Sequence, residues 1–412
     1  MKKYDLCVIG AGAAGLAAAI TAAGKGMSVL VLDKNNKPCK KIYATGNGRC
    51  NITNKNIDIS KHYSSDCKAY SDFLISVMGA SPYQSIKDFL DSLGILTHSI
   101  NDYVYPASMQ ASSLCWTMLD ACRRLNVDII QNEEITHIEK LSSHFNIVMK
   151  NEDITAPKLI LACGGASYSR LGGTKSGYML AESLGHSIKA IRPALCGLVT
   201  AEDTSPINGV RAGGRARLIS NKSDIIAEES GELQFTDYGL SGIMIFNLSS
   251  KTGKLLRDGL SAFIEINFLY GLESETAINT KALIDSNLHR NLMGMLNSMV
   301  NDKLAGYILD RLNMDRKALV RDTDMEDIKK LIYSLSHMRF NITSLKDYEN
   351  AQVTAGGVDI SEIEAYNCRS KLVNNLYIAG EMLDIDGLCG GYNLTFAILS
   401  GIAAGKGAYD TN

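Results

Sequence analysis

Short apolar runs separated by glycines open the chain. Leu6 to Ile9 are four consecutive apolar residues, residues 14–24 are rich in alanine, and a second apolar run covers residues 28–32. Runs of this length are typical of parallel strands that are buried on both faces. The pattern therefore predicts a strand, a helix and a second strand, which together make a βαβ unit.

Glycines stand at the junction between the first strand and the helix. Gly10, Gly12 and Gly15 follow the G-x-G-x-x-G spacing. In this motif the glycines allow a tight turn, a close approach of the backbone to a pyrophosphate, and close packing of the helix on the sheet. N–H groups at the helix start face the phosphates. Asp33 ends the second strand, where an acid accepts hydrogen bonds from a ribose 2′-OH. These features predict a dinucleotide site.

The same segment carries no charge from Leu6 to Gly24, as would a secretory signal or a membrane anchor. Neither alternative explains the glycine spacing, because a signal needs only an apolar run and a small-residue cleavage site. A membrane-spanning helix would be weakened by its glycines, each of which costs about 1 kcal/mol relative to alanine. We therefore expect a cytoplasmic protein without a membrane anchor.

Two later stretches repeat the pattern of strand and glycine turn, "APKLILACGG" (156–165) and "NNLYIAGEMLDIDGLCGGYNLTFAILSGIAAG" (374–405). The second one continues through a Gly-Gly turn into an apolar helix. Helices are predicted near residues 70–95 and 108–125, and a hairpin near 129–150. The C-terminal stretch is expected to return to the sheet that begins near the N-terminus, so that the nucleotide domain is discontinuous.

The middle of the chain has a different pattern. Residues 192–265 contain short alternating runs and many glycines, as in "GVRAGGRARLIS", which is typical of antiparallel strands that close a small barrel. Residues 274–334 show helical periodicity with charged faces, as in "DMEDIKKLIYSL". The sequence therefore predicts an insert made of a barrel and a group of helices.

Composition narrows the functional classes. The 412 residues are 46% hydrophobic and 21% charged with a net charge of −2, as in a soluble enzyme, and they hold no dense block of Lys and Arg. We therefore expect no nucleic acid as a principal partner. The ten cysteines include no C-x-x-C pair, which excludes zinc-ribbon spacing and a disulfide-oxidoreductase motif. No metal site is predicted.

The motifs together resemble a known family. The N-terminal glycine motif, the middle "LACGG" and the late "YIAGE" resemble the two-dinucleotide-binding-domain flavoproteins. More narrowly, "KKIYATGNGRCNITN", "GELQFTDYGLSG", "AQVTAGGV" and "GLCGGYNL" are similar to a bacterial family of NAD(P)/FAD-dependent oxidoreductases of the aminoacetone-oxidase-like or 3-dehydro-bile-acid-reductase-like type. The chain departs from the family pattern at Cys389, where threonine is usual, and at Lys175-Ser176, where Gly-Asp is common.

The resemblance and the residue pattern imply the same α/β fold, a discontinuous Rossmann-like FAD-binding domain with an inserted β-barrel and a helical subdomain. The expected FAD domain covers residues 1–191 and 345–412. The barrel is expected at residues 192–270 and 335–344, and the helical subdomain at residues 271–334.

The loop from Lys40 to Asn51 is glycine-rich and flanked by Lys41 and Arg49, so its N–H groups and cations can approach a flavin or a pyrophosphate. Residues 390–394 open the last helix, whose N-terminus can stabilise negative charge on the N1/C2 edge of reduced flavin. The resemblance places Ile135 against the adenine, and it places around FAD the residues Lys41, Ile42, Thr45, Gly46, Cys50 and Asn51. The expected cofactor-binding residues are Gly10, Gly12, Ala13, Ala14, Gly15, Asp33, Lys34, Lys41, Ile42, Thr45, Gly46, Arg49, Cys50, Asn51, Ile135, Ala162, Cys163, Gly164, Gly380, Glu381, Gly391, Tyr392, Asn393 and Leu394.

Three residues are candidates for catalysis. Tyr238 and Tyr392 could protonate a reduced substrate, and Cys389 lies in the loop expected near the flavin. With one complete dinucleotide fingerprint, a nicotinamide must either bind transiently over the flavin or be absent. The favoured function is an FAD-dependent oxidoreductase that passes hydride from NADH or NADPH through flavin N5 to a small organic molecule, a C=C bond conjugated to a carbonyl being the expected target. The alternatives are an amine oxidase that uses O₂, and a non-catalytic FAD scaffold or RNA-modification accessory.

Overall fold

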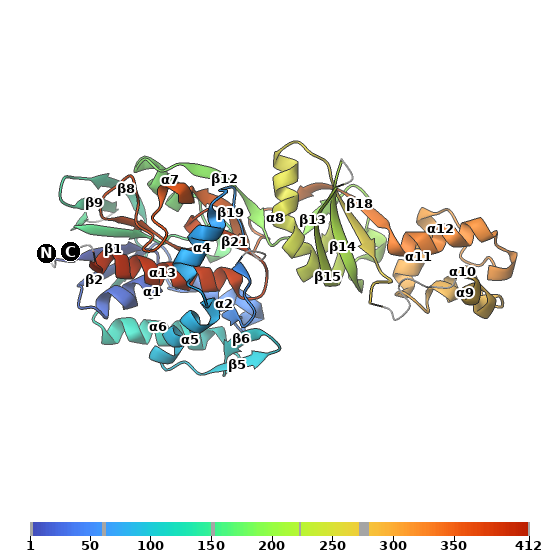
Figure 1. The fold of residues 1–412 in the computed structure, drawn as a ribbon, viewed down its shortest axis with the longest axis horizontal. Coiled ribbons are helices and arrows are strands. Elements are labelled where there is room, and N and C mark those ends of the chain that lie inside the picture. Colours follow the sequence, from blue (N-terminus) through green and yellow to red (C-terminus); the bar gives the residue numbers. More distant parts are fainter. Residues whose placement is uncertain (1–2, 60–62, 150–152, 222–223, 272–279, 411–412) are drawn as a thin grey trace. The chain divides into compact units, whose positions relative to one another are not determined.

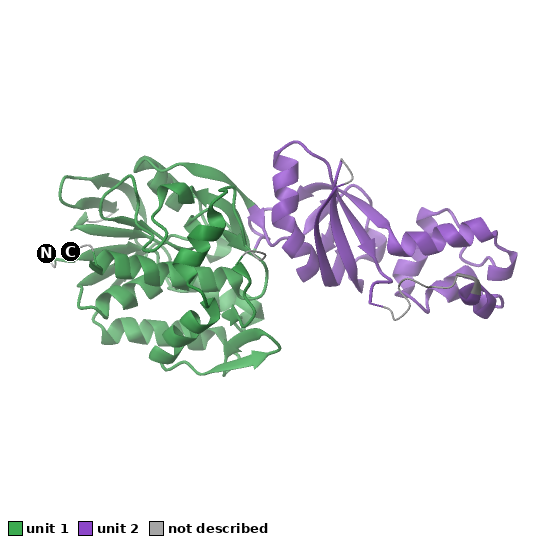
Figure 2. Cartoon of the chain, in the orientation of Figure 1, with its two compact units in different colours: residues 1–192, 352–412 green, residues 193–351 purple. Residues whose placement is uncertain are grey.

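The computed structural model describes residues 3–59, 63–149, 153–221, 224–271 and 280–410 (Figure 1). It divides into two compact units, residues 1–192 with 352–412 and residues 193–351 (Figure 2). Residues 272–279, which the sequence assigned to the helical subdomain, lie outside the described residues.

A five-stranded parallel sheet forms the centre of the first unit, in the order β20-β11-β1-β2-β7. The side chains of its inner strands are buried because helices cover both faces of a parallel sheet. Cys7 of β1 lies between Leu30 of β2 and Leu159 of β11. The strands are β1 (Leu6–Ile9), β2 (Val29–Asp33), β7 (Asp128–Gln131), β11 (Lys158–Leu161) and β20 (Leu376–Ile378).

Two helices lie side by side beside the sheet, α1 (Ala13–Ala23) and α13 (Tyr392–Asp410) (Figure 1). Their backbones come very close because Gly401 and Gly405 face α1, where a Cβ on Gly405 would lie 2.5 Å from the Ala18 carbonyl oxygen. The C-terminal stretch therefore belongs to the same core as residue 6, as the strand and helix pattern predicted.

Smaller elements surround this core. Within the described residues, the other α-helices of this unit are α2 (Lys40–Ala44), α4 (Tyr70–Met78), α5 (Pro82–Ser92), α6 (Ala111–Arg124) and α7 (Ser176–Ser183). The small sheets are β3 (Thr53–Asn54), β6 (Tyr103–Pro106) and β5 (Thr97–Ile100); β10 (Ile154–Ala156), β9 (Phe145–Met149) and β8 (Ile135–Lys140); β12 (Ile188–Ala194) and β19 (Val353–Val358); and β21 (Asp386–Gly387) and β4 (Tyr63–Ser64).

Two sequence predictions in this unit need correction. The segment 70–95 is two helices, because Gly79 takes the left-handed φ of +76° and ends α4. The hairpin begins at β8 rather than near residue 129, because β7 pairs in parallel with β2.

The second unit contains the predicted barrel. Six strands close in the order β13-β16-β15-β14-β17-β18 around buried aromatic side chains, with the rings of Phe235 and Phe340 5.8 Å apart. The strands are β13 (Leu198–Thr200), β14 (Arg211–Ser220), β15 (Ile225–Thr236), β16 (Gly239–Ser241), β17 (Ala262–Asn267) and β18 (Met338–Leu345).

The part of this unit that the structure describes also contains the helices α8 (Ile243–Arg257), α9 (Thr280–Asn287), α10 (Leu292–Leu296), α11 (Asp302–Arg311) and α12 (Met325–Ser336). The interpretation of 192–265 as strands alone missed α8, whose Met244, Ile245 and Leu248 pack into the barrel core. Asp324 caps α12 by accepting a hydrogen bond from the Glu326 amide at 2.8 Å.

Candidate functional site

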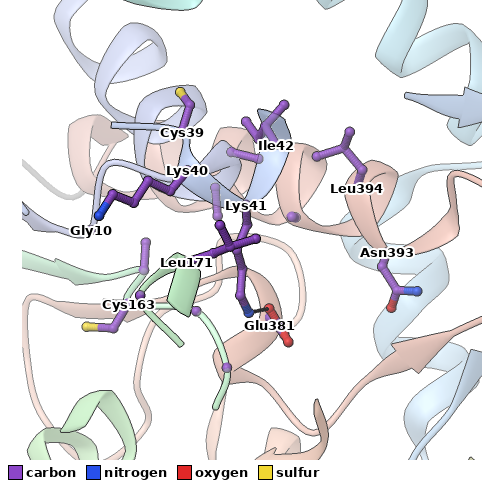
Figure 3. A pocket seen from close by; sticks show the side chains of 18 of the residues that line it. Gly10, Cys39, Lys40, Lys41, Ile42, Cys163, Leu171, Glu381, Asn393 and Leu394 are labelled. Carbon is purple, nitrogen blue, oxygen red and sulfur yellow. Dashed lines mark hydrogen bonds and ion pairs between the residues drawn. The ribbon is translucent and has the colours of Figure 1, made fainter. Parts of the chain in front are cut away.

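A cavity lies in the first unit, where β1, β2 and β11 end (Figure 3). Ligands of open parallel sheets bind outside the carboxyl ends of the strands, which agrees with this position. Fourteen of the residues expected from the sequence to bind the cofactor line the cavity. They are Gly10, Gly12, Ala13, Ala14, Asp33, Lys41, Ile42, Thr45, Ala162, Cys163, Gly164, Glu381, Asn393 and Leu394.

The three motif glycines have different surroundings. A Cβ on Gly10, at φ +108°, would collide with the Ala162 carbonyl, and a Cβ on Gly15 would collide with the Gly10 carbonyl. These two glycines therefore let protein backbones pass close to one another. Gly12 lines the cavity, and a Cβ there would meet no protein atom within 4 Å. The space in front of Gly12 is therefore left for a ligand, as the pyrophosphate function of this glycine requires.

Asp33 holds the glycine loop as well as facing the cavity. Its Oδ2 accepts a hydrogen bond from the Ala11 amide at 2.6 Å, and its Oδ1 accepts two from Asn35, at 2.7 Å from the amide and 2.9 Å from Nδ2. A carboxylate has about four lone-pair positions, so capacity remains for a ribose hydroxyl. Asp33 is thus fixed by the loop it supports, a role that the spacing did not indicate.

A charged pair crosses the cavity. Lys41 of α2 donates to Glu381 at 2.9 Å, and Figure 3 shows the two side chains meeting from elements that are 340 residues apart in the chain. The other Glu381 oxygen accepts a hydrogen bond from the Thr354 amide at 2.9 Å. The pair positions an ammonium group and a carboxylate where hydroxyl and phosphate groups of a nucleotide can bind.

The cavity continues into a smaller pocket that shares Gly10, Asp33, Asn35 and Cys163 with it. Lys34 and Ile135 line this extension. Lys34 donates to the Thr174 hydroxyl at 2.7 Å, and burial lowers the pKa of Lys34. An apolar side chain beside the nucleotide motif is suited to contact an adenine ring.

The start of α13 forms the opposite side of the cavity through Asn393 and Leu394 (Figure 3). The Asn393 side chain fixes the preceding loop by two hydrogen bonds to Gly387. Its Oδ1 accepts one from the Gly387 amide at 2.9 Å, and its Nδ2 donates one to the Gly387 carbonyl at 2.8 Å. Gly391 has φ +93°, and a Cβ there would lie 2.6 Å from the Thr53 Cα. Gly391 therefore lets the helix start against β3.

Other residues that the sequence analysis expected to bind the cofactor do not line the cavity. Gly46 and Arg49 are exposed, Cys50 is buried, and burial raises the pKa of the Cys50 thiol to about 12. Asn51 donates from Nδ2 to the carbonyls of Thr53 and Val104, at 3.0 and 3.1 Å. The expected cofactor-binding residues outside the lining of the two pockets are Gly15, Gly46, Arg49, Cys50, Asn51, Gly380, Gly391 and Tyr392.

The three catalytic candidates occupy different environments. Tyr392 is 6% exposed and packs against Tyr63, whose hydroxyl donates to the Tyr392 carbonyl at 2.7 Å. Cys389 is half-buried in the loop before α13. Tyr238 belongs to the barrel unit, where Lys346 Nζ lies 4.4 Å from its ring centroid. None of the three is among the residues that line the cavity in the described part of the chain.

Several lining residues escaped the sequence analysis. Leu171, Gly172, Gln352 and Ile385 come from loops, and Val353 begins β19. Proximity to a motif could have identified three of them. Gln352 and Val353 lie in the "AQVTAGGV" stretch, and Ile385 lies shortly before "GLCGGYNL".

Three hydrogen-bonded side chains resemble a Ser-His-acid catalytic triad but have a structural role. His186 joins Glu362 at 3.0 Å through Nδ1 and Ser370 at 2.8 Å through Nε2. All three side chains are largely buried, and the Ser370 oxygen already accepts from the amides of Leu372 and Val373. This oxygen has no free lone pair for attack on a substrate. The three side chains therefore link the segment around His186 to the segments around Glu362 and Ser370.

Comparison with known proteins identifies the family. The family described as "HI0933-like protein Rossmann domain" matches residues 4–407. The chain belongs to the HI0933-like family. This HI0933-like flavoprotein is similar to the 3-dehydro-bile acid delta(4,6)-reductase of Clostridium scindens, with 33% identity over 97% of this chain and 98% of the relative. It is also similar to the ribosomal RNA dihydrouridine synthase of Escherichia coli, with 27% identity over 96% of each chain.

Solved structures support the fold of this HI0933-like protein. A 3-ketosteroid delta1-dehydrogenase from Sterolibacterium denitrificans aligns over the whole of both chains with a TM-score of 0.54 and 11% identity. The family is one of FAD-dependent oxidoreductases with a Rossmann-like domain, as the motifs indicated. In the described part of the chain, every helix is too short or too polar to cross a bilayer.

The residues present in this HI0933-like chain fit FAD. The open space before Gly12 suits a pyrophosphate, and Asp33 and Ile135 line the adjoining pocket, where they offer a hydrogen-bond acceptor and an apolar surface.

Proposed function

We propose that this protein is a reductase in which FAD carries a hydride from NADH or NADPH to a C=C bond conjugated to a carbonyl, in a steroid-like or bile-acid-like substrate. The observation that carries the proposal is the full-length similarity to the 3-dehydro-bile acid delta(4,6)-reductase. FAD, when bound, supplies the two-electron exchange that such a reaction needs.

The residues of the chain have distinct tasks in this proposal. Gly12 admits the pyrophosphate, Asp33 accepts from the ribose, and Lys41 with Glu381 binds the polar chain between adenosine and flavin. The partial positive charge at the start of α13 would stabilise the negative charge of a reduced flavin bound in the cavity. These tasks are binding, orientation and charge stabilisation.

An RNA substrate is the main competing proposal, because two relatives are named ribosomal RNA dihydrouridine synthases. RNA binding requires a basic surface that neutralises phosphates. Residues 193–351 contain 18 Lys and Arg against 21 Asp and Glu. Barrel arginines are also paired, as Arg217 with Glu228 at 2.7 Å and Arg339 with Glu265 at 2.8 Å. The charge balance favours a small-molecule substrate.

The proposal is tested by the two half-reactions of the holoenzyme. NADH or NADPH, added without oxygen, should bleach the visible absorption of the bound FAD. A 3-dehydro bile acid with a 4,6-diene should then restore it, whereas a uridine-containing RNA oligonucleotide should not. Restoration by the RNA instead would favour the dihydrouridine activity. Reduction by an amine with peroxide formation in air would favour the oxidase, and a flavin that only dithionite reduces would indicate a scaffold.

A further inference from the structure

The adenosine ribose of FAD is expected at the junction between the cavity and its smaller extension. We expect the pyrophosphate in front of Gly12, which lines the cavity, and the adenine beside Ile135, which lines the extension. The ribose joins these two groups in FAD, so it should face the residues that line both spaces. Among the described residues, these are Gly10, Asp33, Asn35 and Cys163.

The ribose carries adjacent 2′ and 3′ hydroxyl groups, and each needs a hydrogen-bond acceptor when it leaves water. Gly10 has no side chain, and the Cys163 thiol donates to the Ile9 carbonyl, with Sγ and O 3.7 Å apart. Asp33 and Asn35 are therefore the residues at the junction whose side chains offer oxygen atoms.

The Asp33 carboxylate can accept one of the two hydroxyls. Each carboxylate oxygen has about two lone-pair positions. Oδ1 accepts hydrogen bonds from the backbone amide and from Nδ2 of Asn35, at 2.7 and 2.9 Å, so both of its positions are occupied. Oδ2 accepts one hydrogen bond, from the Ala11 amide at 2.6 Å, so one position remains. The second hydroxyl therefore needs another acceptor.

Asn35 has one polar atom that is not bonded to protein. Its backbone amide and its Nδ2 donate to Asp33, and its carbonyl accepts from the Asn132 amide at 3.1 Å. Only the NH₂ group of a primary amide can donate to a carboxylate, so these contacts also establish which end of the side chain is Oδ1. Within the described residues, no donor reaches Asn35 Oδ1.

The Asn35 oxygen lies at the wall of the cavity, beside Gly172. Gly172 lines the cavity at φ +97°, and a Cβ there would lie 2.4 Å from Asn35 Oδ1. The absence of a side chain at Gly172 therefore leaves the space that this oxygen occupies. Because Oδ1 and Nδ2 share one carbon and Nδ2 contacts Asp33, the two acceptors are neighbours, as adjacent hydroxyls of one ribose require.

We propose that Asn35 is a second ligand of the adenosine ribose, with Oδ1 accepting from the 3′-hydroxyl while Asp33 Oδ2 accepts from the 2′-hydroxyl. An acid at the end of the second strand binds the 2′-hydroxyl in dinucleotide folds, which leaves the 3′-hydroxyl for Asn35. The proposal requires FAD binding alone. It is independent of the substrate and of the reductase activity proposed above.

The test measures binding to the full-length chain freed of flavin, by quenching of flavin fluorescence. The ligands are FAD and two FAD analogues whose adenosine lacks either the 2′- or the 3′-hydroxyl group. Wild type should bind the 3′-deoxy analogue about threefold to tenfold more weakly than FAD, as expected for one neutral hydrogen bond. Equal affinity of wild type for these two ligands would overturn the proposal without any variant.

Asn35→Ala assigns the contact to one residue. It should bind FAD more weakly than wild type does and should no longer distinguish FAD from the 3′-deoxy analogue. It should still bind the 2′-deoxy analogue more weakly than FAD, because Asp33 is kept. The control is Asn208→Ala, since Asn208 is exposed in the second unit and lines neither space. This control should match wild type with all three ligands.

A structural role of Asn35 predicts a different pattern. If Asn35 only holds Asp33 in place, Asn35→Ala should lose discrimination against the 2′-deoxy analogue and keep discrimination against the 3′-deoxy analogue, which would overturn the proposal. The melting temperature of each flavin-free variant shows whether the fold is kept. If Asn35→Ala does not fold, the comparison of FAD with the 3′-deoxy analogue in wild type still decides.

These outcomes are separate from those of the proposed function, because they concern the oxidised cofactor without a substrate. Equal binding of FAD and the 3′-deoxy analogue would remove Asn35 as a ligand and leave the reductase proposal standing. A holoenzyme that does not reduce the bile acid would refute the reductase proposal and leave the assignment of Asn35 intact. A chain that binds no FAD would refute both.

Discussion

Gly391 is the position where a single methyl group should change the chemistry of the bound flavin. Its φ is +93°, and a Cβ there would lie 2.6 Å from both Cα and C of Thr53. Thr53 cannot retreat easily, because it pairs with Val104 in the β3–β6 ladder and its hydroxyl accepts from Thr395 at 2.8 Å. We therefore expect Gly391→Ala to push the start of α13 away from β3.

Gly26 provides a matched control. It also has φ +93°, but a Cβ there would meet nothing within 4 Å. Alanine in the left-handed region costs roughly 1–2 kcal/mol at either site. The difference between the two variants therefore isolates the contact with Thr53 from the backbone strain that both share.

The magnitude follows from the charge at the helix start. A well-placed helix terminus stabilises a charge by up to about 2 kcal/mol. For a two-electron couple, about 30 mV corresponds to 1.4 kcal/mol. Displacing α13 should thus lower the midpoint potential of the bound flavin by roughly 20–40 mV.

The assay is a spectroscopic redox titration of both holoproteins against a reference dye, with the FAD content and the melting temperature measured alongside. Gly26→Ala should lose stability and keep the wild-type potential. Gly391→Ala should lose more stability and titrate at a more negative potential. Equal potentials in the two variants would refute the reasoning, because the start of α13 would then not influence the flavin.

Three further predictions follow from the same contacts. Gly12→Ala should fold normally and bind FAD more weakly, whereas Gly15→Ala should lower the melting temperature, because the space before Gly12 is open and that at Gly15 is filled by the Gly10 carbonyl; calorimetry and FAD titration distinguish the two. Asp33→Ala should weaken FAD about tenfold to a hundredfold through loss of hydrogen bonds to a charged group worth ~1.5–3 kcal/mol, and unchanged affinity in a fluorescence titration would contradict this. Burial raises the pKa of Asp384 from 3.8 to about 6, so the free energy of unfolding should fall by about 2–3 kcal/mol as the pH rises from about 4 to about 7, because the folded state then holds a buried charge. Urea unfolding of Asp384→Asn over this same range should lack this decrease, and an equal decrease in the variant would exclude Asp384 as its source.

Local patterns in the sequence were sufficient for β1, β2, β11 and β20 of the parallel sheet, because each is a short run of consecutive buried residues, such as Leu6 to Ile9. They were not sufficient for β7, whose side chains are half-buried or exposed and which the sequence analysis assigned to a hairpin. The glycine motif was equally local, since Gly10 and Gly15 serve contacts within one βα turn or with the adjacent strand end. These elements position the cavity, which is why most of the expected cofactor residues line it.

Local patterns were misleading where neighbours in space decide the conformation. The segment that forms α8 looked like another strand, and its buried face is defined only by the barrel on which it packs. The helix break at Gly79 depended on a left-handed residue that the apolar periodicity of 70–95 did not reveal. Both errors arose because propensity is weak compared with tertiary packing.

By itself, the sequence determined the α/β fold, the nucleotide motif, the family resemblance and the set of elements that meet at the cavity. The tertiary structure decided which groups act on one another: Lys41 with Glu381, and Asp33 with the Ala11 amide. The physical reason is that a hydrogen bond or ion pair depends on a distance of about 3 Å between atoms. Spacing along a chain fixes such a distance only within one helix, strand or turn, and these partners come from separate ones.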